Sequence, residues 1–304
     1  MSKEVAQQTV KFISEHIGER DCLIQWFGGE PLMNTEAIDI IAEKLNNILG
    51  NDKFYSMMVT NGSLINSNII KKMLNSWNVH RVQISLDGAH QAYERRKKYI
   101  DINTPFEIVL NNINNMLQAG IRVYIRINYD QSNYRDIPLL LDILKKEFNS
   151  CENLKVYAEH LFGEKTILIA DKFAKEEWFF IQKALIEYGF TDNLEAFRLE
   201  RRKYKCFACS HRSFVILPDG NLLKCTLALG KNSAYIGNIW NGIERYENLE
   251  KWCDTSLAKE CISCKFLPIC MGGCQAGFLG YGAETCFSKR EFIDDILRER
   301  LKYL

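Results

Sequence analysis

The sequence predicts an α/β protein in which parallel strands alternate with helices, followed by a small cysteine-rich α+β domain. Three observations lead to this prediction. The first two hundred residues alternate short apolar, strand-like runs with segments of helical periodicity. Glycine and polar residues recur at the ends of successive strand-like runs. Nine of the 11 cysteines follow residue 200, where the composition of the chain changes.

Five candidate strands are continuous apolar or β-branched runs, which is typical of parallel strands buried on both faces. They are Cys22–Phe27, Phe54–Thr60, Arg81–Leu86, Ile121–Asn128 and Leu154–His160. Between them lie helix-period segments at Thr35–Leu49, Asn66–Trp77, Pro105–Ala119 and Tyr134–Phe148. Repeated β–α units imply right-handed crossovers and a parallel sheet, either an open doubly wound sheet or a barrel.

The composition excludes several classes of protein. With 304 residues and 47% hydrophobic residues, the chain can bury a sizeable core. Lys+Arg 39 against Asp+Glu 38 leaves a formal net charge of +1, so no basic excess indicates nucleic-acid binding. No apolar run approaches the roughly 18–20 residues of a membrane span, and no signal peptide is recognisable. We therefore expect a cytoplasmic protein without nucleic-acid or membrane partners.

Polar and glycine residues follow the first four candidate strands. The strands end in Gly28-Gly29-Glu30-Pro31, Thr60-Asn61-Gly62, Ser85-Leu86-Asp87-Gly88 and Arg126-Ile127-Asn128. Each motif alone is an ordinary turn, but in a parallel sheet all four lie at one edge, where α/β proteins bind ligands. The glycine pair also removes side chains where a ligand can meet the backbone.

These strand-end motifs resemble those of the radical S-adenosylmethionine (SAM) superfamily. The resemblance implies a partial (β/α) barrel that binds SAM and a [4Fe–4S] cluster. It implies that backbone around Gly28, Gly29 and Glu30 holds the methionyl amino group of SAM. Polar residues at later strand ends would bind its carboxylate and ribose, here Ser85, Arg126 and Asn128. An arginine suits a carboxylate because its planar fork donates two charge-assisted hydrogen bonds.

One motif of that superfamily does not occur ahead of Gly28. Members of the superfamily carry a Cys-x3-Cys-x2-Cys loop after the first strand, and its three thiolates leave one iron free for SAM. Between Met1 and Gly28 the chain has one cysteine, Cys22, which lies inside a candidate strand and is most simply a core residue. We therefore expect a barrel truncated at its N-terminus, without its first strand and without the catalytic cluster ligands.

The cysteines of the last third have the spacing of metal ligands. Cys261-x2-Cys264-x5-Cys270-x3-Cys274-x11-Cys286 is one dense array. Upstream, apolar runs at 213–217 and 221–224 flank the turn Pro218-Asp219-Gly220 and predict a β-hairpin with Cys209 and Cys225 near its outer ends. Cys206 lies three residues before Cys209, so both thiolates can reach one centre. Soft thiolates at such spacings select zinc or iron–sulfur clusters.

This array resembles the SPASM domain, an extension of radical SAM enzymes that modify peptides and proteins. In that family the domain holds two auxiliary [4Fe–4S] clusters. The resemblance implies Cys206, Cys209, Cys225 and Cys274 as the first ligand set and Cys261, Cys264, Cys270 and Cys286 as the second. Cys253 is left over and is interpreted as structural. Two four-thiolate zinc sites would use the same eight cysteines, but the barrel motifs favour clusters. We place the barrel in residues 1–200 and the SPASM domain in residues 201–304.

Three further polar features have a structural and a functional interpretation. His160, at a strand end, is expected to be a core or rim histidine. His211, close to Cys209, could tune a cluster through a hydrogen bond. The run Arg95-Arg96-Lys97-Lys98 indicates a solvated helix end or, alternatively, a surface for an acidic leader peptide.

The resemblances imply an enzyme that modifies a ribosomally made peptide or a protein through a 5′-deoxyadenosyl radical, served by a reductant such as a flavodoxin or ferredoxin. Sulfatase maturation fits less well, because such enzymes carry an Asp directly after the cysteine aligned with Cys225, where this chain has Thr226. Two hypotheses stay open. The chain is a fragment of a peptide-maturing enzyme, or it is a non-catalytic iron–sulfur or zinc protein that binds a peptide or a partner enzyme.

Overall fold

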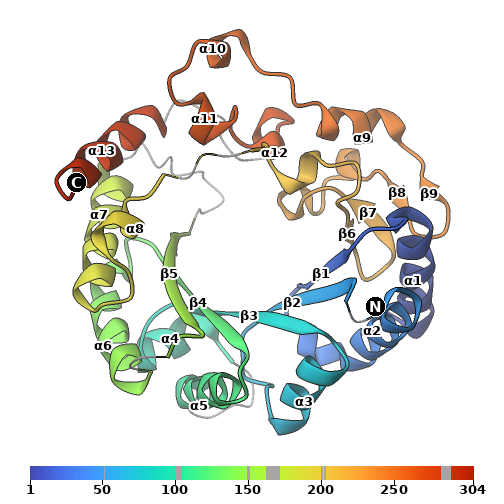
Figure 1. Cartoon of the computed structure of the whole chain (residues 1–304), viewed down its shortest axis with the longest axis horizontal. Helices are drawn as coiled ribbons and strands as arrows, with labels where there is room; N and C mark the ends of the chain where they lie inside the picture. The colour runs from blue at the N-terminus through green and yellow to red at the C-terminus, as the bar shows by residue number, and fades with distance from the viewer. Residues whose placement is uncertain are drawn as a thin grey trace. The chain divides into compact units, whose positions relative to one another are not determined.

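Five parallel strands form the main sheet, in the order β1-β2-β3-β4-β5 (Figure 1). The strands are β1 (Cys22–Trp26), β2 (Phe54–Thr60), β3 (Val79–Leu86), β4 (Arg122–Tyr129) and β5 (Leu154–His160). The structure is a computed structural model that describes residues 1–50, 52–99, 105–148, 151–161, 172–199, 201, 203–281 and 289–304. Every strand pair of this sheet is parallel and consecutive in sequence, so the predicted parallel α/β sheet is confirmed.

Helices join the strands, and the sequence predicted each of them except α4. They are α2 (Thr35–Leu49), α3 (Ser67–Asn75), α4 (His90–Lys97), α5 (Pro105–Gln118) and α6 (Ile137–Glu147). The side chain of Asn34 accepts a hydrogen bond from the Ala37 amide and caps α2, and Asn66 caps α3 in the same way. Gly50 ends α2 at a positive φ of 80°.

The two faces of the sheet are buried to different extents. Along β2 and β4, fully buried residues alternate strictly with half-buried ones. Figure 1 shows α2, α3, α5 and α6 along the convex face of the curved sheet. The expectation of two buried faces was therefore wrong, because helices cover one face while the concave face carries polar side chains. That arrangement matches a partial barrel and not a doubly wound sheet.

The chain forms two compact units that are not contiguous in sequence. The β/α unit consists of Glu19–Leu161 and Glu176–Ala196. The cysteine-rich unit consists of Met1–Gly18, the described part of Phe162–Lys175, and Phe197–Leu304. Helices α7 (Lys172–Glu187) and α8 (Asn193–Ala196) follow β5. The single boundary expected near residue 200 differs from this division, and the assignment of residues 201–304 as a SPASM domain stays a prediction.

Helix α1 (Lys3–Ile17) explains why the first residues join the cysteine-rich unit. Val5 and Phe12, on one face of this amphipathic helix, are buried in one core with Leu222 and Trp252. The ring of Phe12 also meets that of Phe214 edge-on, with centroids 5.4 Å apart. Burial of this apolar stripe stabilises the helix in the unit that supplies its partners.

Short elements make up the rest of the cysteine-rich unit. An antiparallel sheet contains β6 (Val215–Ile216), β7 (Asn221–Leu223), β8 (Gly237–Asn238) and β9 (Gly242–Ile243). The pairing of β6 with β7 confirms the predicted hairpin. The helices are α9 (Tyr246–Cys253), α10 (Lys259–Ile262), α11 (Leu267–Cys270), α12 (Gln275–Phe278) and α13 (Lys289–Leu301).

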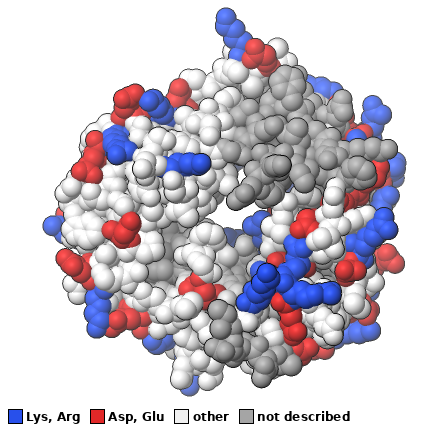
Figure 2. Space-filling model, turned by 180° about the vertical axis from the view of Figure 1, so that it is seen from behind, with Lys and Arg blue, Asp and Glu red and all other residues white. Residues whose placement is uncertain are grey.

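Surface charge is mixed, as the net charge of +1 leads us to expect. On the face shown in Figure 2, basic and acidic side chains are interspersed. No helix within the described residues combines the length and apolar character that crossing a bilayer requires.

Candidate functional site

The carboxylate of Glu30 ties the loop after β1 to the end of β2. Its Oε1 accepts hydrogen bonds from Thr60 Oγ1 at 2.7 Å and from the Leu32 amide at 3.1 Å. Its Oε2 accepts one from the Asn61 amide at 2.7 Å. Because these contacts occupy the carboxylate, the backbone of the loop and not this side chain stays available to a ligand.

Gly28 and Gly29 leave this backbone accessible. Gly28 has a φ of +151°, a conformation that residues with side chains rarely adopt. A Cβ atom built at either glycine would meet no atom within 4 Å. The loop therefore borders open space where the amino group of a ligand can approach the backbone.

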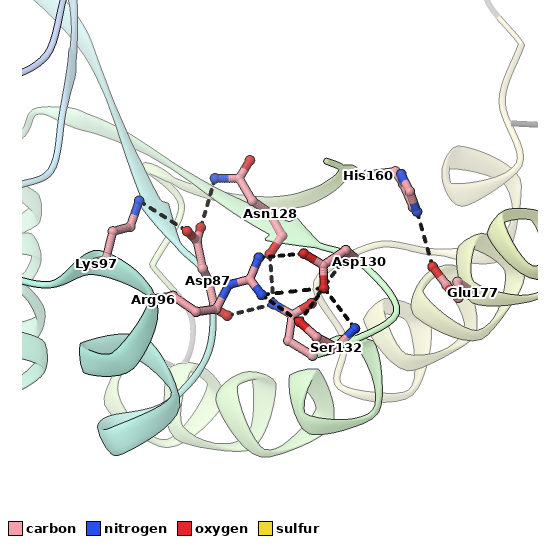
Figure 3. Close-up of polar contacts among 9 residues, drawn as sticks. Asp87, Arg96, Lys97, Asn128, Asp130, Ser132, His160 and Glu177 are labelled. Atoms are coloured by element: carbon pink, nitrogen blue, oxygen red, sulfur yellow. Dashed lines mark hydrogen bonds and ion pairs between the residues drawn. The ribbon is translucent and has the colours of Figure 1, made fainter. Parts of the chain in front are cut away.

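Ser85 and Asn128 meet through Asp87 and Lys97, as Figure 3 shows in part. Lys97 Nζ, from α4, donates to Ser85 Oγ at 2.7 Å and lies 3.3 Å from Asp87 Oδ2. Asn128 Nδ2 donates to Asp87 Oδ1 at 2.8 Å. Asn133 Nδ2 donates to the Asp87 carbonyl at 2.7 Å. This network places a cation beside Ser85, one of the predicted ligand-binding residues.

The basic run of α4 divides into two inward and two outward residues. Arg96 donates to Asp130 Oδ2 and to Ser132 Oγ, both at 2.8 Å (Figure 3). Burial opposes ionisation of Asp130, but hydrogen bonds from Arg96 and from the hydroxyl and amide of Ser132 outweigh it and lower the pKa of Asp130 to about 2. Arg95 and Lys98 are exposed. The prediction of a solvated helix end therefore describes half of the run. The contacts of Arg96 and Lys97 were missed, because only the fold brings them to the strand ends.

Arg126 is the predicted carboxylate partner, and it lies on the concave face of the sheet. Its register partners are Ser85 on β3 and Tyr157 on β5. Its Nε is buried and has no hydrogen-bond partner among the described residues. Desolvation raises the pKa of the neighbouring Glu159 carboxyl, and the charge of Arg126 opposes that rise. A buried donor without a partner fits an anionic ligand such as the SAM carboxylate.

Two tyrosines that the sequence did not single out line the same strand ends. Tyr93, fully buried on α4, lies with its hydroxyl 2.6 Å from that of Tyr99. Tyr99 donates onward to the Asn61 carbonyl at 3.4 Å. Burial raises the pKa of Tyr93, so both hydroxyls stay protonated near neutrality. Their spacing in the sequence does not indicate this contact, because Tyr93 lies on α4 whereas Tyr99 lies in the segment that follows the helix.

Four cysteines expected to form the first ligand set act on one another electrostatically. Burial raises the pKa of the Cys209 thiol, and the thiols of Cys206 and Cys253 add to that rise. Burial likewise raises the pKa of Cys225, with contributions from Cys274 and Cys206. All cysteines within the described residues are free thiols. The structure also brings Cys253, interpreted from sequence as structural, near Cys209.

The second ligand set is described in part. Cys261 is buried on α10. Cys264, which follows α10, and Cys270, the last residue of α11, are half-buried. Cys286 lies outside the described residues. In the part of the chain that the structure describes, no three cysteine, histidine or acidic side chains lie close enough to hold a metal ion. Eight soft thiolate donors are nevertheless the set that iron–sulfur clusters or zinc require.

The other candidates have structural partners. His211 Nε2 lies 3.3 Å from Glu250 Oε1, at the surface, so its predicted role beside a cluster stays a prediction. His160 is a rim histidine, as expected, and its Nε2 lies 3.2 Å from Glu177 Oε2 (Figure 3). Cys22 is a buried core residue of β1, as expected, and burial raises its pKa to about 11.

Known proteins share this fold and parts of this sequence. Fe-coproporphyrin III synthase of Methanosarcina barkeri is 30% identical over 125 residues, which are 41% of this chain and 29% of that protein. The radical SAM cyclopropyl synthase TigE of Paramaledivibacter caminithermalis is 26% identical over 298 residues, covering 90% of this chain and 59% of that protein. The chain thus spans less than two thirds of either curated relative.

Solved structures of low identity share the fold along most of the chain. Native anSMEcpe with bound AdoMet and the Cp18Cys peptide has a TM-score of 0.65 at 18% identity, with 100% of this chain and 88% of that chain covered. Streptococcus suis SuiB bound to its precursor peptide SuiA has a TM-score of 0.62 at 16% identity, with 94% and 69% covered. The family model described as the radical SAM superfamily matches residues 1–144. Residues 1–144 therefore contain a radical SAM domain.

Proposed function

We propose that this chain binds SAM and a peptide or protein substrate, and that it holds two auxiliary [4Fe–4S] clusters of an enzyme that modifies the substrate. Two features of the β/α unit carry the proposal. The backbone at Gly28 and Gly29 is open, and the buried Arg126 Nε has no hydrogen-bond partner among the described residues. The neighbours anSMEcpe and SuiB, which are described with bound peptides, support a peptide substrate.

Residues at the strand ends would bind different parts of SAM. The backbone from Gly28 to Glu30 receives the methionyl amino group, and Arg126 receives the carboxylate. Ser85, Asn128 and the adjacent Lys97 surround the polar remainder of SAM. Together with a reduced catalytic cluster, whose Cys-x3-Cys-x2-Cys loop these 304 residues do not contain, bound SAM would supply a 5′-deoxyadenosyl radical for hydrogen abstraction from the substrate. Asp87, which bonds Lys97 and Asn128, holds these side chains in place.

The cysteine-rich unit supplies the auxiliary sites. Cys206, Cys209, Cys225 and Cys274 would hold the first cluster, and Cys261, Cys264, Cys270 and Cys286 the second. The electrostatic coupling of Cys209 with Cys206, and of Cys225 with Cys274, supports the first set. Free thiols suit a reducing compartment such as the cytoplasm, where a flavodoxin or ferredoxin is available as reductant.

SAM binding by an Arg126 variant tests the site. Arg126→Met should weaken SAM binding at least about tenfold in equilibrium dialysis, because a charge-assisted bidentate contact is lost. Arg122→Met is the matched control, since Arg122 lies on the same strand but is exposed. Equal SAM affinity of the two variants would refute the site.

Metal analysis tests the auxiliary sites. After anaerobic reconstitution we expect about eight irons per chain and broad visible absorption. Four or fewer irons with stoichiometric zinc would identify a zinc protein instead.

A further inference from the structure

Two buried lysines lie beside the cysteines of the first ligand set. Within the described residues, Lys205 and Lys224 are the lysines that are buried, at 7% and 2% exposure. Lys205 directly precedes Cys206, and Lys224 directly precedes Cys225. Lysine is among the residues least often buried, so this placement requires a physical reason.

Both ammonium groups are held in place. Lys224 Nζ donates to the carbonyls of Ser210 and Ser213, at 2.5 Å each, and lies 4.9 Å from the centre of the Phe214 ring. Lys205 Nζ lies 4.2 Å from the centre of the Phe278 ring. Carbonyl oxygens and aromatic faces attract a cation but do not neutralise its charge.

No carboxylate neutralises these lysines among the described residues, where neither ammonium forms an ion pair within 4.0 Å. Lys205 contributes to the lowered pKa of Asp254, but Asp254 is exposed. The groups nearby that can become anionic include the half-buried thiols of Cys209 and Cys253. Burial raises the pKa values of Cys209 and Cys253; the charges of both lysines oppose the rise at Cys209, and that of Lys224 opposes it at Cys253. A buried ammonium is strongly destabilising unless an anion accompanies it.

We propose that Lys205 and Lys224 are the built-in counter-charges of the first auxiliary site and make its cluster easier to reduce than the second. The inference rests on the proposed function, since it requires both clusters. A cluster held by four thiolates is anionic, and a fixed positive charge beside it favours the added electron. Near the second set, Lys265 is exposed and pairs with Asp294 at 3.0 Å, so it offers little compensation there.

The potential of each cluster tests the proposal. Lys224→Met and Lys205→Met remove one charge each while keeping an apolar stem of similar length. A unit charge acting over roughly 10 Å at an effective dielectric of about 20 changes an equilibrium by about tenfold. We therefore expect each variant to lower the reduced-to-oxidised ratio of one cluster about tenfold at a fixed potential, equal to about 59 mV for a one-electron couple.

The experiment is a potentiometric titration of the reconstituted full chain with dithionite, followed by electron paramagnetic resonance. Lys224→Arg should restore the wild-type potential, because it keeps the charge. Lys231→Met, which removes an exposed charge of the same unit, should shift neither cluster. An unchanged potential in both methionine variants, with about eight irons still bound, would overturn the proposal. Fewer than about eight irons in the wild type would instead refute the proposed function.

A second measurement does not depend on the folding of the lysine variants. In the chain with native lysines, the cluster that reduces first should disappear in Cys225→Ala and persist in Cys264→Ala. The opposite order would overturn the proposal as well.

Discussion

Replacing Glu30 by Gln should loosen the edge of the sheet where β1 meets β2. Glu30 accepts three hydrogen bonds, two of them at 2.7 Å. A glutamine keeps one carbonyl oxygen for Thr60 Oγ1 and the Leu32 amide, but it turns an amide donor toward the Asn61 N–H. One charge-assisted hydrogen bond is lost and one donor is left facing another. The expected cost is about 1.5–3 kcal/mol.

Hydrogen–deuterium exchange is the appropriate assay, because a protein of two compact units need not unfold in one step. The expected cost corresponds to exchange about 10- to 150-fold faster in peptides that cover β1 and β2. Peptides of the cysteine-rich unit should be unaffected. Glu43→Gln, at an exposed position of α2, is the matched control and should change nothing. Unchanged protection of β1 and β2 in Glu30→Gln would refute the anchoring role of this carboxylate.

Three further outcomes can be measured. Because the pKa of Asp130 is lowered to about 2, its contribution of about 1 kcal/mol is present above its unfolded pKa near 4 and is lost as pH falls toward 2. Asp130→Asn should abolish this loss in acid unfolding curves, and an identical pH dependence would contradict it. Cys225→Ala and Cys264→Ala should each retain about four irons and Cys253→Ala about eight, and loss of four irons in the last would make Cys253 a ligand. These 304 residues contain no Cys-x3-Cys-x2-Cys loop, so with dithionite they should form no 5′-deoxyadenosine above background by chromatography unless such a loop is supplied. Multiple turnovers without it would show that another cysteine set binds SAM.

Local signals predicted the elements of the β/α unit well. The bounds of β2, β5 and α2 agree with the sequence prediction, because turn residues or caps such as Asn34 and Gly50 interrupt each run. The strand-end motifs also converge as expected, since parallel strands share an edge. Both successes depend on interactions between residues that are close in sequence or on the regular geometry of a sheet.

The contacts that sequence reasoning missed are long-range and irregular. Lys97 reaches Ser85 and Asp87 because α4 folds back over the strand ends, which no periodicity in the basic run indicates. The sequence did not predict that one face of the sheet is only half-buried. Residues on that face, such as Tyr124, are apolar enough to resemble core residues in the sequence. Cys253 acts electrostatically on Cys209 because it is the last residue of α9. Its spacing from the other cysteines in the sequence does not indicate this.

The packing of α1 against residues far along the chain has a consequence for the order of folding. Gln8 Nε2 donates to the Ile239 carbonyl at 2.9 Å, across 231 positions of sequence. During synthesis the β/α unit is complete on emergence from the ribosome, whereas the apolar stripe of α1 waits for partners made much later. Such a high contact order slows folding and prolongs exposure of apolar surface. We expect the cysteine-rich unit to form last, so that the eight thiols proposed as ligands come together only after the sheet is in place.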